Sequence, residues 1–405
     1  MNWIQIGRLV HSIYSHNGKL PNLEWIQSLG LLAVILGQGH AVRSDFLEPE
    51  KCEHLSKLFR NNESMGPEDF LKLVESTAVP EFISNFEKIE ADALATASVG
   101  QVHLGTLNDG TRVVIKAVKK DVRKNFIADV SSVRRLFRFI AFFYRKLKRV
   151  GNPEAILNDI EEYTLSELDL RKEVDGVRTL ASIRDENKDQ YDFSKLSFSR
   201  VHEPLCNNNV MVSDFIPGPS LDELLDEGKL DYDTLLELFK IHGYYMFCAG
   251  IFHGDLHPGN VLVDEDQGHF YFIDTGYIGR VSPKIRKGLF YFFKALTEND
   301  FSEASRALNT MSDDPLIGKT MKKFESDLIK LYEDFPGSKV SEISLTRKMM
   351  ETIRLGVESG MSFDQGIFAI VRSLMYLDGM VLRCNPDAVL MEDMKAFIDD
   401  FEKFI

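Results

Sequence analysis

The chain has 405 residues, 44% of them hydrophobic, which is enough to form two hydrophobic cores. Its formal net charge of −14 argues against nucleic-acid binding, because proteins of that class attract phosphate backbones with a basic surface. The four cysteines are scattered without a CxxC pair, so we expect neither a disulfide framework nor a structural zinc site. A reducing compartment, the cytoplasm, is predicted.

In chain order, residues 1–90 are predicted to form a mostly helical N-terminal extension, because apolar residues recur there at helical spacing. From Asp92 the pattern changes to short β-like runs, 97–107 and 111–118. The two runs are joined by Asn-Asp-Gly, and Asp-Gly between alternating apolar segments is a strong hairpin signal. A small antiparallel sheet is therefore expected to begin here.

Two long helices are predicted next, near 121–149 and 153–184. Between Lys119 and Arg149 there are eleven Lys or Arg against two Asp, a local balance of +9 that leaves −23 for the rest of the chain. The stretch also carries many aromatic residues, a composition suited to peripheral contact of 121–149 with anionic lipid, although most charged helices are simply solvated. Apolar runs fall short of the ~20 residues that cross a bilayer, so a soluble or peripheral protein is expected.

Another β run spans 209–216 and meets a break at Pro-Gly-Pro-Ser. Beyond it the chain is expected to be helical to the end, interrupted at 251–279 by two short strands that flank a Gly- and Asp-rich stretch. The predicted domains are a helical extension (1–90), a sheet-containing lobe with a helical insertion (91–218) and a helical lobe (219–405).

The strongest motif is His-Gly-Asp-Leu-His-Pro-Gly-Asn at 253–260, followed after a hairpin by Asp-Thr-Gly at 274–276. Asp255 and Asn260 reproduce the spacing of the kinase catalytic loop, and Asp274 stands where the metal-binding aspartate follows it. Phosphoryl transfer needs such a carboxylate near the attacking hydroxyl, and further oxygens that hold Mg²⁺ against the phosphates. Turn chemistry alone also favours these residue types, but three constrained polar positions flanked by strands make a catalytic site the better interpretation.

Each residue of the motif is given a role. Asp255 is the candidate base or orienting carboxylate, and Asn260 and Asp274 are the candidate metal ligands. His253 is expected to brace the loop through hydrogen bonds. His257 fills the position at which many protein kinases carry a lysine close to the γ-phosphate.

Lys116, in Val-Val-Ile-Lys-Ala-Val, matches the strand lysine that pairs with the α- and β-phosphates of ATP. A buried lysine requires a partner, and the acidic residues of the following helix can supply one. Glu173 is the first choice and Glu167 the second, and the spacing leaves both open. The segment containing Asp214 and Ile216 has the character of an adenine-contacting hinge, in which backbone groups do the pairing.

These residues together resemble the UbiB (AarF) family of atypical kinases. Residues 93–103 are similar to the alanine-rich loop that replaces the glycine-rich loop in that family, and Glu-Leu-Asp-Leu-Arg-Lys-Glu at 167–173 resembles its ExD motif with the lysine-pairing glutamate. Leu-Gly-Gln at 36–38 resembles the KxGQ element, with Ile35 in place of its lysine. The resemblance implies nucleotide contacts for the following residues of the loop: Ala95, Ala97, Ser98, Val99, Gly100 and Gln101.

The resemblance implies an α+β, protein-kinase-like, two-lobed fold, with a small antiparallel sheet in the N-lobe, a helical N-terminal extension and a mainly helical C-lobe. It implies an ATP-binding, Mg²⁺-dependent kinase or ATPase that acts near lipid or quinone metabolism, with a lipid or quinone precursor as ligand. Two alternatives stay open. The first is a small-molecule phosphotransferase of the aminoglycoside or choline kinase type, and the second is a nucleotide-binding scaffold without catalysis.

Overall fold

The computed structural model describes residues 1–15, 20–41, 49–59, 64–96, 99–143, 153–264, 268–363 and 366–405. The chain divides into two compact units. The first consists of Met1–Lys172 and Arg200–Phe215, and the second of Glu173–Ser199 and Ile216–Ile405. The described residues of each unit include hydrophobic cores that belong to it alone.

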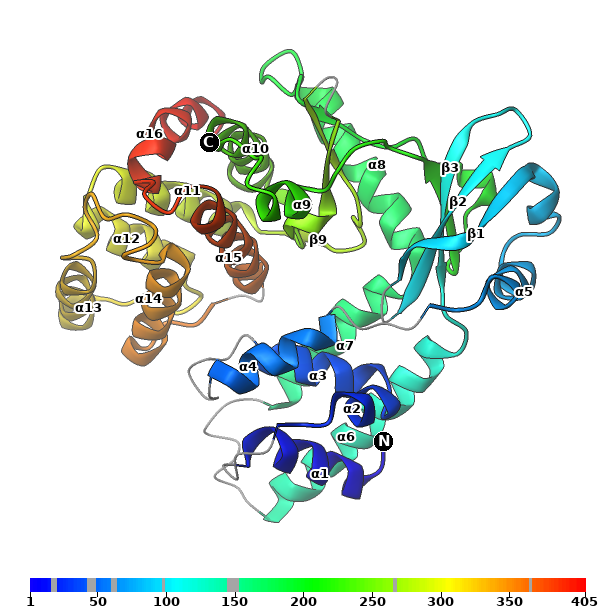
Figure 1. The fold of residues 1–405 in the computed structure, drawn as a ribbon. Helices are drawn as coiled ribbons and strands as arrows, with labels where there is room; N and C mark the ends of the chain where they lie inside the picture. The colour runs from blue at the N-terminus through cyan, green and yellow to red at the C-terminus, as the bar shows by residue number, and fades with distance from the viewer. Residues whose placement is uncertain are drawn as a thin grey trace. The chain divides into compact units, whose positions relative to one another are not determined.

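The first unit combines N-terminal helices with a four-stranded antiparallel sheet in the order β1-β2-β3-β5 (Figure 1). Its elements are α1 (Trp3–Tyr14), α2 (Leu23–Ser28), α3 (Leu31–Ala41), α4 (Pro49–Ser56), α5 (Pro67–Thr77), β1 (Phe86–Thr96), β2 (Gly100–Leu107), β3 (Arg112–Val118), α6 (Val122–Phe143), α7 (Pro153–Glu167) and β5 (Val210–Asp214).

The β2–β3 hairpin forms at the predicted place. Gly110 adopts φ +85°, a conformation that glycine reaches without strain, and the Asp109 carboxylate accepts a hydrogen bond from the Thr111 N–H at 2.9 Å. One face of the sheet packs on α5, where Phe70 and Val74 meet Ile115 in a shared core. Strand β1 begins at Phe86 rather than at Asp92, because it is a largely exposed edge strand without clear apolar alternation.

The second predicted helix, 153–184, is in fact two helices: α7 ends at Glu167 and α8 (Leu170–Asn187) begins after a break. Asp169 explains the break, since its carboxylate accepts hydrogen bonds from the Arg171 backbone N–H at 3.3 Å and from the Arg171 guanidinium. The Leu170 N–H donates a hydrogen bond to the Asn208 carbonyl at 3.1 Å. Local side-chain bonding of this kind starts a new helix rather than continuing the old one.

The second unit is mainly helical and carries two small sheets, β4-β8-β7 and β6-β9. Its elements are most of α8, β4 (Leu196–Ser197), α9 (Leu221–Asp226), α10 (Tyr232–Gly243), β6 (Ile251–His253), β7 (Val261–Asp264), β8 (His269–Phe272), β9 (Ile278–Arg280), α11 (Pro283–Thr297), α12 (Phe301–Met311), α13 (Gly318–Leu331), α14 (Leu345–Ser359), α15 (Gly366–Cys384) and α16 (Leu390–Phe401).

Segment 251–279 therefore contributes four short strands, where the sequence predicted two. Strands β6 and β9 are only three residues long and pair through residues 251–253 and 278–280, so each lacks the run of alternating residues that reveals a strand. The helical character beyond Ser220 is confirmed. No helix among the described residues has the length and apolar content needed to cross a bilayer.

Candidate functional site

The motif 253–260 leaves strand β6 and returns through a short 3₁₀ turn into β7. His253 is fully buried, and its two ring nitrogens serve two different backbone segments. Nδ1 accepts a hydrogen bond from the Asp255 N–H at 3.2 Å, and Nε2 donates to the Ile273 carbonyl at 2.9 Å. His253 thus ties the backbone of Asp255 to the backbone of Ile273, the residue before Asp274. This is the bracing role predicted for it.

Burial keeps this histidine neutral. Loss of hydration lowers the pKa of His253 below its usual value, although the Ile273 carbonyl and the Asp255 carboxylate favour the proton. The neighbouring His242 is also buried, and burial lowers its pKa to about 3. A neutral ring with hydrogen on Nε2 is the form that the two hydrogen bonds of His253 require.

Asp255 and Asn260 are held in one turn by three further hydrogen bonds. The Asp255 carbonyl accepts from the His257 N–H at 2.7 Å and from the Asn260 amide nitrogen at 3.0 Å, and the His257 carbonyl accepts from the Asn260 N–H at 2.7 Å. The bond from its amide nitrogen leaves the side-chain oxygen of Asn260 as the atom available to a metal ion. Carboxylate and amide oxygens are the ligands that Mg²⁺ takes in proteins.

Asp274 follows β8 and joins the same loop. The Ile273 N–H donates to the Asn260 carbonyl at 3.0 Å, so the residue before Asp274 is bonded directly to the backbone of the other predicted metal ligand. Asp274 itself adopts φ +56°, a left-handed conformation that non-glycine residues rarely hold and that concentrates at functional sites. The structure therefore brings Asp255, Asn260 and Asp274 together within the second unit.

Asp274 and Asn260 carry side-chain oxygens of the kind that bind Mg²⁺. Among the described residues there is no group of three or more His, Cys, Asp or Glu that could hold a metal ion by themselves. Mg²⁺ is ordinarily bound by one or two carboxylates, with waters and substrate phosphates filling its remaining positions. Asp274 and Asn260 would supply the protein oxygens of such a site.

Glu173 lies in the first turn of α8 and is 7% exposed. Its backbone carbonyl accepts a hydrogen bond from the Thr275 hydroxyl at 2.8 Å, which joins the helix to the Asp-Thr-Gly motif. Glu167, the second choice as partner of Lys116, is the last residue of α7 and thus sits on a different helix. Asp169, which lies between these two residues in the sequence, forms an ion pair with Arg171 at 2.7 Å. The hydrogen bonds from the Arg171 side chain hold the pKa of the Asp169 carboxyl below its usual value.

In the first unit, Lys116 lies on β3 directly opposite Val102 of β2. Cross-strand partners share a face of the sheet and neighbours along a strand alternate, so Lys116 is on the face away from α5. Gln101, opposite Ala117, is on the other face. It is buried there, bonded to the backbone of Met65 at 2.8 and 3.2 Å and to His103 at 2.7 Å. The structure does not bring the Gln101 side chain to the face of Lys116.

The remaining nucleotide-loop residues are placed in part. Ala97 and Ser98 lie outside the described residues, and Ala95 is exposed near the end of β1. The Val99 carbonyl accepts from the Lys119 N–H at 2.9 Å. Gly100 packs so closely on β3 that a Cβ atom would lie 2.7 Å from the Ala117 carbonyl oxygen, so packing alone requires glycine there.

The predicted hinge residues fall in different units. Asp214 ends β5 in the first unit, where its carboxylate lies 2.7 Å from Nε2 of His202. Ile216 begins the second segment of the other unit and is half-buried. Of the Leu-Gly-Gln element in α3, Gln38 donates to the Leu58 carbonyl at 3.2 Å, so this residue is anchored within the N-terminal helices.

His257 is exposed, and its ring meets the edge of Tyr376 with centroids 5.4 Å apart. Tyr376 belongs to α15, as does Arg372, whose guanidinium lies 5.1 Å from the centre of the Tyr277 ring. For this part of the chain the sequence predicted helix and no functional residue. Their i, i+4 spacing places them on one helix face, but nothing in the sequence indicates that this face lies against the catalytic loop.

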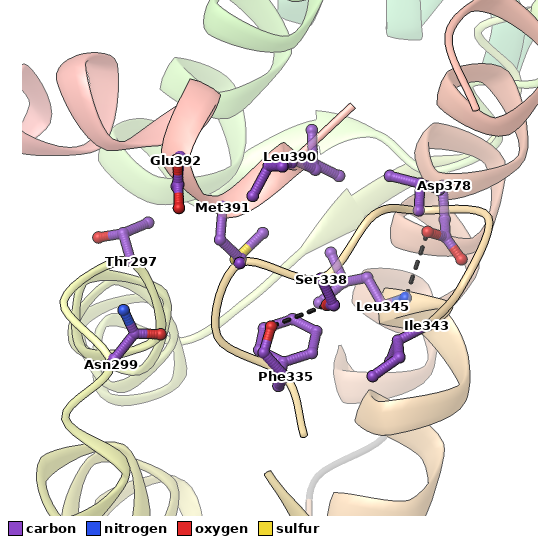
Figure 2. A pocket seen from close by; sticks show the side chains of 13 residues that line it. Thr297, Asn299, Phe335, Ser338, Ile343, Leu345, Asp378, Leu390, Met391 and Glu392 are labelled. Atoms are coloured by element: carbon purple, nitrogen blue, oxygen red, sulfur yellow. Dashed lines mark hydrogen bonds between the residues drawn. The ribbon is translucent and has the colours of Figure 1, made fainter. Parts of the chain in front are cut away.

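A separate pocket lies among α11, α14, α15 and α16 (Figure 2), and none of the motif residues lines it. Its volume of about 20 Å³ has room for roughly one water molecule, so it is too small for a substrate. Beside it Asp378, 7% exposed, accepts hydrogen bonds from the Ser344 hydroxyl and from the Leu345 and Thr346 N–H groups, which caps α14. This pocket is structural.

Comparisons with known proteins place the motif residues 253–276 inside a region that matches a family model. The model of the ABC1 atypical kinase-like domain matches residues 57–308. The chain is 24% identical to the probable protein kinase UbiB of Glaesserella parasuis, over 93% of this chain and 69% of that protein, and 24% identical to the one of Vibrio cholerae, over 92% and 69%. It is similar in fold, with a TM-score of 0.58 and 16% identity, to the solved erythromycin complex of Rv3197 from Mycobacterium tuberculosis, over 93% of this chain and 92% of that chain.

Proposed function

This chain belongs to the ABC1 atypical kinase-like family, and from that premise we propose that it binds ATP with Mg²⁺ and transfers or hydrolyses the terminal phosphate. The predicted family resemblance and the predicted α+β, protein-kinase-like fold are both confirmed. The observation that best supports the activity is the loop of the second unit, in which Asp255, Asn260 and Asp274 are joined through His253 and through backbone hydrogen bonds.

In the proposed reaction, Asp255 orients the attacking hydroxyl, of an acceptor or of water, and takes up its proton. The hydroxyl oxygen forms a bond to the γ-phosphorus while the bond from that phosphorus to the bridging oxygen breaks, and the electron pair leaves with ADP. Asn260 and Asp274 supply the oxygens for Mg²⁺, which neutralises charge on the phosphates. His257 is proposed to contact the γ-phosphate.

We propose further roles from the sequence motifs. Lys116 pairs with the α- and β-phosphates and is itself paired by Glu173. Backbone groups near Val99 and Gly100, together with Ala95, are proposed to approach the phosphates, and the backbone around Asp214 and Ile216 to pair with adenine. The Gln101 side chain is left out of this proposal because it is bonded to Met65 and His103 on the opposite face of the sheet.

ATP turnover tests the activity. We expect Asp255→Asn to reduce Mg²⁺-dependent ADP release by at least about 100-fold, the lower end of what a positioned general base contributes. Asp313→Asn is the matched control, because Asp313 is an exposed carboxylate of the same unit, paired with Lys284 at 3.2 Å. Turnover by Asp255→Asn at the wild-type rate would remove the catalytic proposal and leave a nucleotide-binding scaffold.

The proposed acceptor class is a lipid or quinone precursor, reached through peripheral contact of 121–149 with a membrane. Arg134 and Arg123 of this segment form ion pairs within the protein: the guanidinium of Arg134 lies 2.5 Å from the Glu161 carboxylate, and that of Arg123 lies 3.8 Å from the Asp169 carboxylate. The remaining basic residues would have to supply the attraction to anionic lipid. Equal sedimentation with neutral and with anionic phospholipid vesicles would contradict this proposal.

A further inference from the structure

Helix α8, which carries Glu173, is attached to the rest of the second unit by hydrogen bonds from three hydroxyl groups. The Thr275 hydroxyl donates to the Glu173 carbonyl at 2.8 Å, the Tyr245 hydroxyl donates to the Leu180 carbonyl at 2.8 Å, and the Tyr244 hydroxyl donates to the Asn187 side chain at 3.0 Å. These bonds hold the first turn, the middle and the last residue of the helix. From Glu173 onward the helix accordingly belongs to the same compact unit as the catalytic loop.

One turn beyond Glu173, at Gly176, the helix also makes a direct backbone contact with Thr275. A Cβ atom on Gly176 would lie 2.0 Å from the Thr275 carbonyl oxygen and 2.9 Å from its carbonyl carbon, so only glycine allows the helix this close. Glu173 and Gly176 are three residues apart and therefore lie on the same face of the helix. That face rests on Thr275, which is completely buried.

Thr275 also directly follows Asp274, which is held at φ +56°. One buried residue therefore contacts the turn that carries Glu173 and adjoins the predicted metal ligand. In protein kinases the glutamate of this helix and the metal-binding aspartate must both be in place, and moving the helix is a common means of control. Here the close contact between Gly176 and Thr275 opposes such a movement.

We propose that Thr275 is a positioning residue that locks the Glu173 turn of α8 to Asp274, so that the two are set together and the helix does not swing independently. This inference rests on the proposed function for its effect on catalysis. It assigns to the threonine of the Asp-Thr-Gly motif a task that neither its own chemistry nor the spacing of the motif indicates.

The test compares Thr275→Val, which keeps the shape of the side chain and removes the hydroxyl, with Thr275→Ser, which keeps the hydroxyl. Two quantities are measured: amide hydrogen exchange of residues 173–180 without nucleotide, and the Mg²⁺ concentration that gives half-maximal ATP turnover. For Thr275→Val we expect exchange about tenfold faster and a Mg²⁺ requirement about tenfold higher, the scale of one buried hydrogen bond. Thr275→Ser should restore both quantities to within about twofold of wild type.

Tyr245→Phe serves as a control for simple loosening of the helix. It removes the bond to Leu180, so exchange near Leu180 should rise while the Mg²⁺ requirement stays unchanged. Should Thr275→Val not fold, Thr275→Ala removes the same bond and leaves more room. In that variant the same two changes support the proposal, and the lack of either change refutes it.

The outcomes separate this inference from the proposed function. Thr275→Val with wild-type exchange would refute the lock, and faster exchange with an unchanged Mg²⁺ requirement would refute the positioning role. An increase in the Mg²⁺ requirement equal to that of Tyr245→Phe would refute it as well. If the wild-type protein shows no Mg²⁺-dependent turnover, the proposed function and the catalytic part of this inference fail together, while exchange in the nucleotide-free protein still decides whether Thr275 holds α8.

Discussion

Replacement of His253 by alanine is predicted to destabilise the second unit by about 4–7 kcal/mol. The ring is fully buried, lies edge-on to Phe272 with centroids 5.8 Å apart, and makes hydrogen bonds to the Asp255 N–H and the Ile273 carbonyl. Each hydrogen bond contributes on the order of 1 kcal/mol, and truncation of a large buried side chain costs roughly 2–5 kcal/mol in lost contacts and cavity formation. The same change should loosen the loop that carries Asp255 and Asp274.

Urea unfolding followed by far-UV circular dichroism measures this loss. The only two tryptophans, Trp3 and Trp25, both lie in the first unit, so their fluorescence follows that unit as an internal reference. His257→Ala is the matched control: His257 is exposed and accepts one hydrogen bond, from the Gly259 N–H, so its loss should cost less than about 1 kcal/mol. If His253→Ala lowers the free energy of unfolding no more than His257→Ala does, the bracing role is refuted.

Three further predictions concern stability. Burial lowers the pKa values of His242 and His253, so as the pH falls the unfolded chain binds protons before the folded one. The free energy of unfolding should therefore fall from about pH 6.5 downward, by up to ~1.4 kcal/mol per pH unit for each histidine, and the melting temperature should fall with it. A constant melting temperature from pH 7 to 5 would contradict this. Gln101→Leu leaves the Met65 backbone N–H and carbonyl unpaired and should destabilise the first unit by ~2–3 kcal/mol, with unchanged affinity for nucleotide. A tenfold weaker affinity at unchanged stability would show instead that Gln101 contacts the nucleotide. Asp378→Ala removes the acceptor of the Leu345 and Thr346 N–H groups at the start of α14 and should cost ~1–2 kcal/mol in thermal unfolding, whereas an unchanged melting temperature would show that these bonds contribute nothing.

Features encoded by neighbouring residues could be predicted from the sequence. The hairpin between β2 and β3 was predicted from its Asp-Gly turn. Asp255, Asn260 and Asp274 were predicted to lie together from their spacing, and hydrogen bonds connect them in one loop. The bracing role of His253 was also predicted, because a histidine at the start of such a loop has backbone groups within reach. In each case the signal and the structure lie within a short stretch of chain.

Features that depend on distant segments were not predictable. The break between α7 and α8 depends on Asn208 accepting the Leu170 N–H, which the helical periodicity of 153–184 does not reveal. The direction of the Gln101 side chain depends on strand register, and a shift of one residue would reverse it. The contact between Gly176 and Thr275 joins residues about a hundred positions apart. The sequence of a helix that contains a glycine does not indicate which residue packs against that glycine.

Thermal unfolding with nucleotide shows whether the protein binds ATP together with Mg²⁺. The melting temperature would be measured with ATP and with ADP, with and without Mg²⁺, for the wild-type protein, Asp274→Asn and Lys116→Ala. A ligand at 100 times its Kd stabilises the folded state by about 2.7 kcal/mol, which should raise the melting temperature by roughly 5–10 °C. We expect an increase in the melting temperature that requires Mg²⁺ and is lost in both variants. No increase at millimolar nucleotide, or an equal increase in Asp274→Asn, would contradict it.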